Sequence, residues 1–415
     1  MEFKVSREHF TRNRKQNFPL LILFMMNFLK KSLSIEIDNF TNIFKENITH
    51  SFTKSAFVQA RKKVKPEVFE QLSQLLVNEF YTDNELAIKR WKGFRLLSVD
   101  GSRVTLPITK ELKDIYGESK NQSKTTIVQA RCSVMYDVLN KYVIEGVLAP
   151  LKEGERTLAL SHLEYCKSND LVLYDRGYPS YDFIFQHTKR SLDYLIRVKI
   201  SFSQLVKDFE QSKKKSLIVE IYPGKNTNVS NKDYTKNCAI KVRLIRVALG
   251  KGQVEVLMTS LLNSIKYPTS LFKQLYFKRW GVETFYDELK NKLKIEHFSG
   301  YSNKSIQQDF KAALLMSNVQ TLIVNELEDD LKRSNQGKKY DYKINTNMSY
   351  GLLKNRVITL FLDEKNKESN LVEELKNIFK AHLVPIRPNR KFERNIGKYR
   401  TRTKPKITKN QKDTI

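Results

Sequence analysis

The sequence is poor in the residues that build disulfide and zinc sites. Its three cysteines, Cys132, Cys166 and Cys238, lie far apart and form no C-x-x-C pair, and its six histidines show no metal-ligand spacing. Neither a disulfide framework nor a zinc knuckle is therefore indicated. We expect a protein of a reducing compartment, the cytoplasm.

Long hydrophobic runs are also lacking. The longest apolar stretch, residues 18–29, has about a dozen residues, whereas a helix needs ~20 to span a bilayer. No small-residue cleavage site of a signal peptide follows it. We predict a buried helix here and no membrane partner.

Acidic residues are in the minority. The chain of 415 residues has 74 Lys and Arg against 45 Asp and Glu, a formal charge of +29 that is spread along the sequence. Such an excess favours binding to polyanions, above all nucleic acid. A bias of A·T-rich coding DNA toward lysine is the alternative explanation.

Residues 1–90 have a helical pattern. Thr53 is placed to cap a helix that ends in a basic edge, and Pro66 is placed to open the next helix. Two helices joined in this way are typical of a helix-turn-helix that binds DNA. A plain helical hairpin with a solvated lysine face explains the segment equally well.

The middle of the chain alternates strands and helices. From about residue 94 the order is βββαβαβ, with helices expected at 154–166 and 180–190. This order predicts an α/β fold with a mixed sheet and helices on its faces. A polar, strand-rich insertion follows at about 199–262.

The last part of the chain is expected to be mostly helical. One long helix begins near Pro268, a second spans 305–327, and two more follow a loop at 329–349. The basic tail from about Pro385 has little to bury, so we expect it to be disordered when free.

Two acids, Asp100 and Asp175, directly follow apolar strands. Ligands gather at the carboxyl ends of strands in α/β sheets. Two carboxylates there repel each other unless a cation lies between them, and oxygen ligands suit Mg²⁺ or Mn²⁺. An aspartate that only forms a turn is the alternative for each.

A third acid lies in a helix at residues 276–292. At about 100° per residue, Tyr276, Arg279, Glu283, Asp287 and Lys290 share one arc, and apolar residues occupy the other side. Glu283 can complete a site for two metal ions, and Arg279 and Lys290 can hold phosphates. A surface helix with i,i+4 ion pairs, such as Arg279 with Glu283, is the competing interpretation.

These residues resemble a known family, the DDE transposases of bacterial insertion sequences, and within it the IS-four-type group. The family pattern of Tyr, two residues, Arg, three residues, Glu, six residues and Lys is present without a gap at residues 276–290. The segments VDGSRVTLP and LYDRGYPSYDF resemble the family's two aspartate blocks. The resemblance covers about residues 45–320.

The resemblance implies a ribonuclease-H-like core of the retroviral-integrase type with a β insertion. Asp100, Asp175 and Glu283 are then the catalytic residues and the ligands of Mg²⁺ or Mn²⁺, with two ions per site. The expected regions are an N-terminal DNA-binding region at 1–90, a catalytic domain at 91–328, and a C-terminal helical region with a basic tail at 329–415. The expected DNA contacts are Tyr276, Arg279, Lys290, Arg176, Arg61, Lys62 and Lys63.

The implied activity is cut-and-paste transposition. The partners would be double-stranded DNA, both the terminal inverted repeats and the target, and a second copy in a homodimer. The place of action would be the bacterial cytoplasm, at the nucleoid. A catalytically inactive DNA-binding relative and a nuclease without strand transfer are the alternatives.

One position departs from the family. Some relatives have a tryptophan in the strand before the signature, where it stacks on a flipped base, and by alignment Glu255 stands here. Base flipping usually relies on aromatic stacking. The choice between a DNA-hairpin route and another cleavage route therefore stays open.

Overall fold

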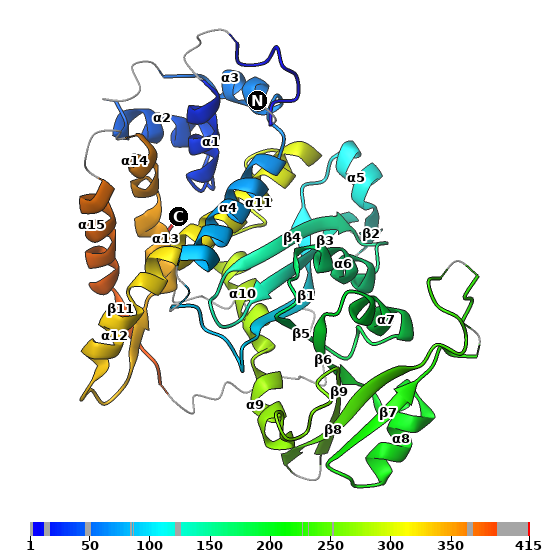
Figure 1. Ribbon diagram of the computed structural model, residues 1–415. Coiled ribbons are helices and arrows are strands. Elements are labelled where there is room, and N and C mark those ends of the chain that lie inside the picture. Colours follow the sequence, from blue (N-terminus) through cyan, green and yellow to red (C-terminus); the bar gives the residue numbers. More distant parts are fainter. Residues whose placement is uncertain are drawn as a thin grey trace, which may run out of the picture. The chain divides into compact units, whose positions relative to one another are not determined.

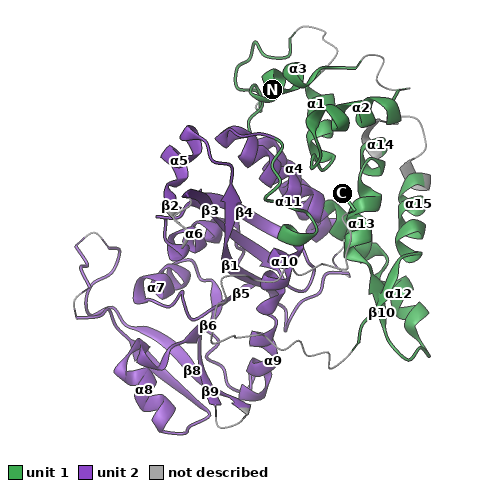
Figure 2. Ribbon diagram, turned by 180° about the vertical axis from the view of Figure 1, so that it is seen from behind, with its two compact units in different colours: residues 1–65, 289–299, 319–415 green, residues 66–288, 300–318 purple. Residues whose placement is uncertain are grey.

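The computed structural model describes residues 3–11, 17–45, 51–83, 85, 87–120, 126–225, 227–230, 232–250, 253–362, 368–387 and 414–415. The chain divides into two compact units (Figure 2). The sheet unit comprises residues 66–288 and 300–318, and the helical unit comprises residues 1–65, 289–299 and 319–415. Within the described ranges no helix is long and apolar enough to cross a membrane.

The sheet unit contains one mixed sheet of nine strands, ordered β2-β3-β1-β5-β6-β9-β8-β7 with β4 paired to β3 (Figure 1). The strands are β1 (Arg95–Leu106), β2 (Glu118–Lys120), β3 (Thr126–Asp137), β4 (Val143–Pro150), β5 (Asp170–Tyr174), β6 (Asp193–Val198), β7 (Ser216–Ile221), β8 (Ile240–Gly250) and β9 (Gln253–Thr259). The predicted α/β class with a mixed sheet is confirmed. The structure adds α5 (Lys110–Tyr116) and the short β2 between the first two predicted strands.

The centre of the sheet has the strand order β4-β3-β1-β5-β6. The β3 strand pairs antiparallel with both β4 and β1, whereas β1, β5 and β6 run parallel to one another. Where these strands run parallel, their side chains are mostly apolar and buried, as in Leu96, Leu97, Leu171, Val172, Leu173, Leu195 and Ile196, as expected for strands that are covered on both faces. The parallel register therefore puts the carboxyl end of β5 beside the middle of β1, just beyond Ser98.

Helices cover both faces of this centre. On one face, α10 (Trp280–Asn291) places Phe285 on Tyr136 of β3, with ring centroids 4.8 Å apart. On the opposite face, η1 (His162–Tyr165) bonds β3 through His162 and Ser133, and α7 (Tyr181–Lys189) packs Phe183 on Tyr174. The helix α6 (Glu155–Ser161) leads into η1, and α4 (Glu67–Asp83) bonds the end of β3 through Tyr81 and Asp137.

The strand-rich insertion extends the same sheet. Its last strand, β9, pairs antiparallel with β6, and β8 and β7 follow outward to the sheet edge. It also contains a helix that the sequence analysis missed, α8 (Gln204–Gln211). Ser203 caps this helix, and its one apolar face buries Val206 and Phe209.

The helix around residues 276–292 is not continuous. It is divided into η3 (Thr269–Leu271), α9 (Phe272–Phe277) and α10, so the expectation of one long helix from Pro268 is wrong. Between α9 and α10 the amide of Arg279 bonds the carbonyl of Tyr276 at 3.0 Å, and that of Gly281 bonds Lys278 at 2.9 Å. These bonds to the third residue back tighten the chain. The regular helix that carries Glu283 therefore begins only at Trp280.

The helical unit combines segments from both ends of the chain. Its helices are α1 (Phe18–Met26), α2 (Leu33–Ile43), α3 (Lys54–Arg61), α12 (Glu328–Asn335), α13 (Thr346–Leu353), α14 (Arg356–Leu362) and α15 (Glu368–Lys380). The predicted buried helix at 18–29 is confirmed as α1, where Phe24 packs edge-on against Phe40, Phe52 and Phe57. A buried ion pair of 2.9 Å between Glu36 and Lys354 joins the N-terminal and C-terminal segments.

Two predictions on the C-terminal side have different outcomes. The expected loop at 329–349 is wrong, because it contains α12, β10 (Tyr342–Ile344) and the start of α13, and β10 pairs with β11 (Leu383–Pro385). The helix expected at 305–327 is present as α11 (Asn303–Glu326). Most of the basic tail lies outside the described residues.

Candidate active site

The register of β1 and β5 places the two aspartates at one edge. The parallel ladder ends at the pair Ser98 and Leu173. Alternate residues of a strand lie on the same face, and neighbouring strands are about 4.8 Å apart. Asp100 and Asp175 are each two residues further on, so both lie beside the end of this ladder and on one face. That face is the one that α10 covers, because the Ser98 hydroxyl bonds the Arg279 carbonyl at 3.3 Å.

The position of Asp100 within its strand differs from the expectation. It does not end a strand, because β1 continues to Leu106 as the antiparallel partner of β3, with Asp100 opposite Val134. The expectation that the strand stops at Asp100 is therefore wrong. Asp175 does follow β5 directly, and its Oδ1 accepts a hydrogen bond of 2.6 Å from the amide of Gly177.

The α10 helix brings Glu283 to the same place through Arg279. Nη2 of Arg279 lies 2.5 Å from Oε1 of Glu283, and Nη1 lies 3.9 Å from Oδ2 of Asp100. One guanidinium thus lies between the first and third predicted acids. The i,i+4 pair of Arg279 and Glu283, which was the alternative to an acidic site, is present, and Asp100 lies beside it.

The electrostatics of Asp100 link all three acids. Burial raises the pKa of Asp100 to about 6. The hydrogen bond from Gly101 and the charge of Arg279 lower the pKa of this carboxyl, and the charges of Glu283 and Asp175 raise it. Neighbouring carboxylates repel one another, which favours a cation between them.

Arg279 is itself unusual in its surroundings. It is 5% exposed, and its guanidinium lies over the rings of Tyr276 and Trp280, at 5.8 and 5.3 Å from the centroids. Its Nε and Nη1 atoms are buried and donate no hydrogen bond to any residue that the structure describes. Unused buried donors are costly, so this side chain can accept a further anionic partner.

Two residues that the sequence analysis missed hold the site together. The Tyr286 hydroxyl lies 2.8 Å from the carbonyl oxygen of Asp100 and 3.0 Å from that of Cys132, which ties α10 to both β1 and β3. The Ser98 hydroxyl bonds the carbonyls of Arg279 and Leu173. In the sequence, Tyr286 and Ser98 differ from their neighbours only in having a hydroxyl group among residues expected to be buried.

The residues fit a divalent metal by their chemistry but not by their present arrangement. Three carboxylates on one face are the donor set that Mg²⁺ and Mn²⁺ take. Within the described residues, however, no group of three or more His, Cys, Asp or Glu side chains is arranged to hold a metal ion. The cation recorded beside two of these carboxylates is Arg279, which pairs with Glu283 and lies near Asp100.

The other candidate DNA contacts are distributed differently. Tyr276 is buried beside Arg279, and Arg176 is exposed next to Asp175. Lys290 lies two turns after Glu283 on α10. Arg176 is thus exposed to solvent, whereas Tyr276 is buried.

The basic edge of α3 needs a correction. Thr53 caps this helix as predicted, and Lys62 and Lys63 are at least partly exposed. Arg61, by contrast, is 3% exposed, lies over the ring of Phe57, and donates a hydrogen bond of 2.8 Å to Ser299. Its guanidinium is used inside the helical unit and is not presented to a ligand.

Glu255, which stands where some relatives have tryptophan, is in an ion pair. Its Oε1 lies 2.8 Å from Nη1 of Arg197. Arg197 is two residues after Leu195, the register partner of Leu173, and so lies level with Asp175 on the next strand. A charged pair thus occupies this position instead of a stacking ring.

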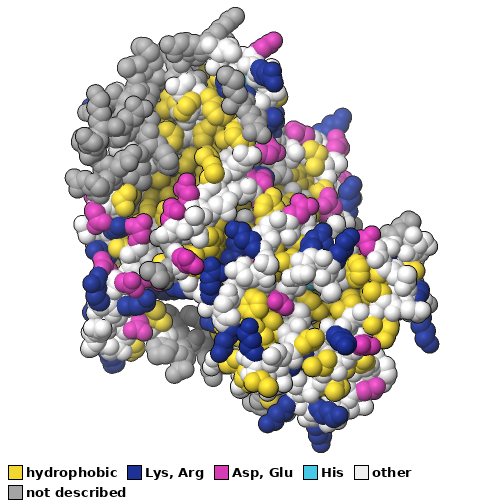
Figure 3. Space-filling view, viewed as in Figure 1, with side chains coloured by type: hydrophobic (Ala, Val, Ile, Leu, Met, Phe, Trp, Pro, Cys, Tyr) yellow, Lys and Arg dark blue, Asp and Glu magenta, His cyan; other side chains and the backbone are white. Residues whose placement is uncertain are grey.

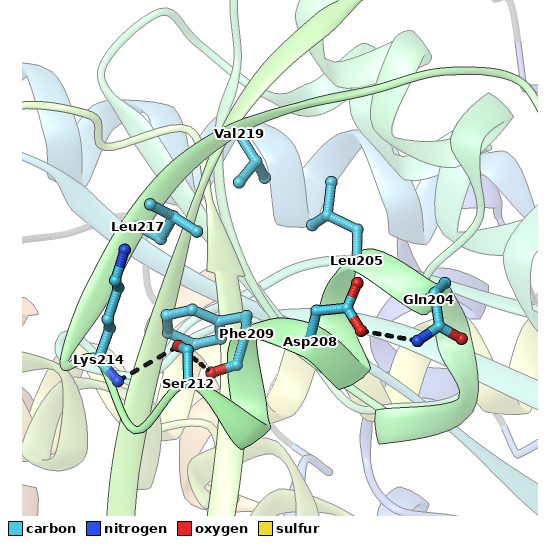
Figure 4. A pocket seen from close by; sticks show the side chains of 8 residues that line it. All are labelled: Gln204, Leu205, Asp208, Phe209, Ser212, Lys214, Leu217 and Val219. Carbon is cyan, nitrogen blue, oxygen red and sulfur yellow. Dashed lines mark hydrogen bonds between the residues drawn. The ribbon is translucent and has the colours of Figure 1, made fainter.

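A pocket of about 460 Å³ lies elsewhere, between α8 and β7 (Figure 4). Its lining includes Leu205, Phe209, Leu217 and Val219, with Asp208 bonded to Gln204. None of the predicted site residues lines it.

Lys and Arg side chains are spread over the face drawn in Figure 3, with Asp and Glu among them. The positive charge is therefore not confined to one tail.

The comparison with protein families now defines the class. Residues 91–319, more than half of the chain, match the family described as Transposase DDE domain. The chain therefore belongs to this family, whose members are DNA-cleaving transposases. DNA is the partner that this class implies.

The relatives agree with the IS-four-type group that the signature indicated. The chain is 22% identical over 372 residues to the transposase InsG for insertion sequence element IS4 of Escherichia coli strain K12, covering 82% of this chain and 76% of the relative. It is 26% identical over 137 residues to the putative transposase InsZ of the same strain, covering 32% and 44%. Among solved structures, a piggyBac transposase synaptic complex with hairpin DNA matches at a TM-score of 0.37 and 10% identity, over 90% of this chain and 80% of the other. That last similarity is too low to support an argument.

Proposed function

We propose that the chain cleaves the terminal inverted repeats of its own insertion sequence and transfers the cleaved strand to target DNA. Asp100, Asp175 and Glu283 are the proposed catalytic residues. The observation that carries this proposal is the pairing of Arg279 with Asp100 and Glu283, together with the strand register and charge interaction that relate Asp175 to Asp100.

We also propose that the core is ribonuclease-H-like. The support is the order β4-β3-β1-β5-β6, with two antiparallel pairings followed by two parallel ones. The insertion of β7, β8 and β9 between Asp175 and Glu283 agrees with the expected family architecture.

Asp100, Asp175 and Glu283 would hold one or two Mg²⁺ or Mn²⁺ ions. When bound, such ions lower the pKa of an attacking water or hydroxyl and stabilise the leaving oxygen. The chain's own part is to hold the three carboxylates on one face and to keep the scissile phosphodiester in line. Arg279 serves the second task, since its buried donors, Nε and Nη1, suit a phosphate oxygen.

The remaining DNA contacts follow the direction of the helix. Lys290 lies seven residues beyond Glu283, about 10 Å along α10, where it can contact a neighbouring phosphate as a point charge. Arg176 can do the same beside Asp175. We propose Lys62 and Lys63 of the helical unit as further contacts, and two copies of the chain as the unit that bridges two ends.

The test is cleavage of duplex DNA that carries the element's ends, with Mg²⁺. Asp100→Asn, Asp175→Asn and Glu283→Gln should each abolish cleavage while the gel shift of the same DNA is kept. Asp114→Asn, which changes an exposed acid of the same unit, is the matched control and should cleave normally. Full cleavage by any of the three site variants would contradict the assignment.

The same assay separates the alternatives. A catalytically inactive DNA-binding relative would shift the DNA but never nick it. A nuclease without strand transfer would nick the DNA but give no joined products. The intact set of three acids argues against the catalytically inactive relative, and joined products would exclude the nuclease.

A further inference from the structure

Arg279 is a proposed phosphate contact, and it also lies beside two of the carboxylates that are proposed to hold the metal ion. Its Nη2 bonds Glu283 at 2.5 Å, and its Nη1 lies 3.9 Å from Asp100. The carboxylates that would hold a metal ion are therefore partly neutralised by a resident cation. Guanidinium and metal ion compete for the same negative charge.

We propose that Arg279 weakens metal binding in the DNA-free protein, and that a DNA phosphate removes this restraint by drawing the guanidinium away from Glu283. This inference rests on the proposed function. Metal and DNA would then bind cooperatively, since each favours the same position of Arg279. Such coupling is necessarily reciprocal.

The formal charges explain the direction of the effect. Three carboxylates and one guanidinium leave the site with two negative charges, which a single divalent ion neutralises. A second ion would leave the site positive, and a phosphate diester restores one negative charge. The second ion therefore depends most strongly on DNA.

The surroundings of Arg279 make the movement possible. Only Nη2 is engaged in a short ion pair, whereas Nε and Nη1 are buried without hydrogen bonds. A phosphate can satisfy these two donors, which compensates for the loss of the bond to Glu283. Glu283 itself is partly exposed, with 36% of its side chain accessible, so its carboxylate can reorient.

The experiment is calorimetric titration of the full-length DNA-free protein with Mn²⁺. Arg279→Ala should bind Mn²⁺ about tenfold more tightly than the unmodified protein, a coupling of ordinary size. Arg197→Ala is the control, because it removes a positive charge level with Asp175 without touching Glu283. Its affinity should stay within about twofold of the unmodified protein.

Asp100→Asn separates this inference from the proposed function. If Asp100→Asn leaves Mn²⁺ binding unchanged, the proposed metal site itself is wrong. If Asp100→Asn removes binding but Arg279→Ala binds no more tightly than the unmodified protein, the metal site stands and the coupling is wrong.

A second measurement needs no change at Arg279. The chain has two tryptophans, so Trp91→Phe leaves Trp280, whose ring lies 5.3 Å from the guanidinium carbon, as the only indole reporter. Mg²⁺ should change Trp280 emission in a saturable way, and Asp100→Asn should remove the change. Unchanged emission at saturating Mg²⁺ would overturn the proposal, even if Arg279→Ala does not fold.

Discussion

The hydroxyl of Tyr286 lies 2.8 Å from the carbonyl oxygen of Asp100, and both the ring and the hydroxyl are buried between α10 and the sheet. The contact fixes the helix that carries Glu283 against the strand that carries Asp100. Tyr286 is therefore a positioning residue, since it acts through the acids without being one of them.

Tyr286→Phe should lower the rate of end cleavage more than it lowers affinity for the DNA ends. The ring keeps its packing, but the tie to Asp100 and Cys132 is removed, which costs about 1–2 kcal/mol of stability. Single-turnover cleavage and gel shifts of the same DNA check this. Equal losses of rate and affinity would indicate general unfolding instead of misplacement.

The pKa of Asp100 predicts how metal binding depends on pH. Burial raises it to about 6, above its ordinary value of 3.8, in the metal-free fold. The folded protein thus holds this proton more tightly than the unfolded chain, and stability falls as pH rises from about 4 to about 6. Mg²⁺ binds the ionised form, so the increase in melting temperature on adding Mg²⁺ should be large at pH 7.5 and small at pH 5. Raising the Mg²⁺ concentration should move the midpoint to lower pH, and a pH-independent effect would show that Asp100 is not a ligand.

A buried ion pair of the sheet unit predicts a strong effect on stability. Nε and Nη2 of Arg95 bond both carboxylate oxygens of Asp170, at 2.7 and 2.6 Å, with almost no exposure. Arg95→Met alone leaves a buried charge without a partner and should cost about 3–5 kcal/mol in urea unfolding. The double variant Arg95→Met with Asp170→Leu should recover part of this loss. A double variant less stable than the sum of the two singles would contradict this account.

The basic edge of α3 gives a prediction that separates two roles. Lys62→Ala with Lys63→Ala should weaken DNA binding and reduce the salt dependence of log K, by about 0.9 for each phosphate that the variant no longer binds. Arg61→Ala should instead lower the melting temperature, because the Arg61 side chain is buried against Phe57 and Ser299. Fluorescence anisotropy over a series of salt concentrations and thermal melts of the same variants check both. An unchanged salt slope in the lysine variant would remove α3 from the DNA interface.

Much of the fold could be predicted from local patterns. The strands β1, β3, β4, β5 and β6 were identified from short apolar runs bounded by turn residues. The helix at α8 was missed because its polar positions hide a single apolar face formed by Val206 and Phe209. The expected loop at 329–349 was wrong for a similar reason, as short elements there are held by β10 pairing with β11 across about 40 residues of chain.

The candidate site was predicted in its members but not in its contacts. The spacing of Arg279 and Glu283 put them on one helical arc, and the two strand-following acids suggested one edge of a sheet. The structure shows that Arg279 bonds Glu283 and also lies near Asp100, which no pattern of spacing can decide. The burial of Arg61 likewise depends on Ser299, a residue far away in the sequence.

By itself, the sequence determined which residues are candidates for chemistry, the strand order along the chain, and the transposase family, because these depend on residue type and local spacing. Only the tertiary structure decided that Asp100 and Asp175 share one face, that Tyr286 ties Glu283's helix to them, and that Arg279 lies between the acids. The physical reason is that register, burial and ion pairing are set by contacts between segments far apart in the chain. Those contacts determine whether a charged side chain is free to meet a ligand or is already paired within the protein.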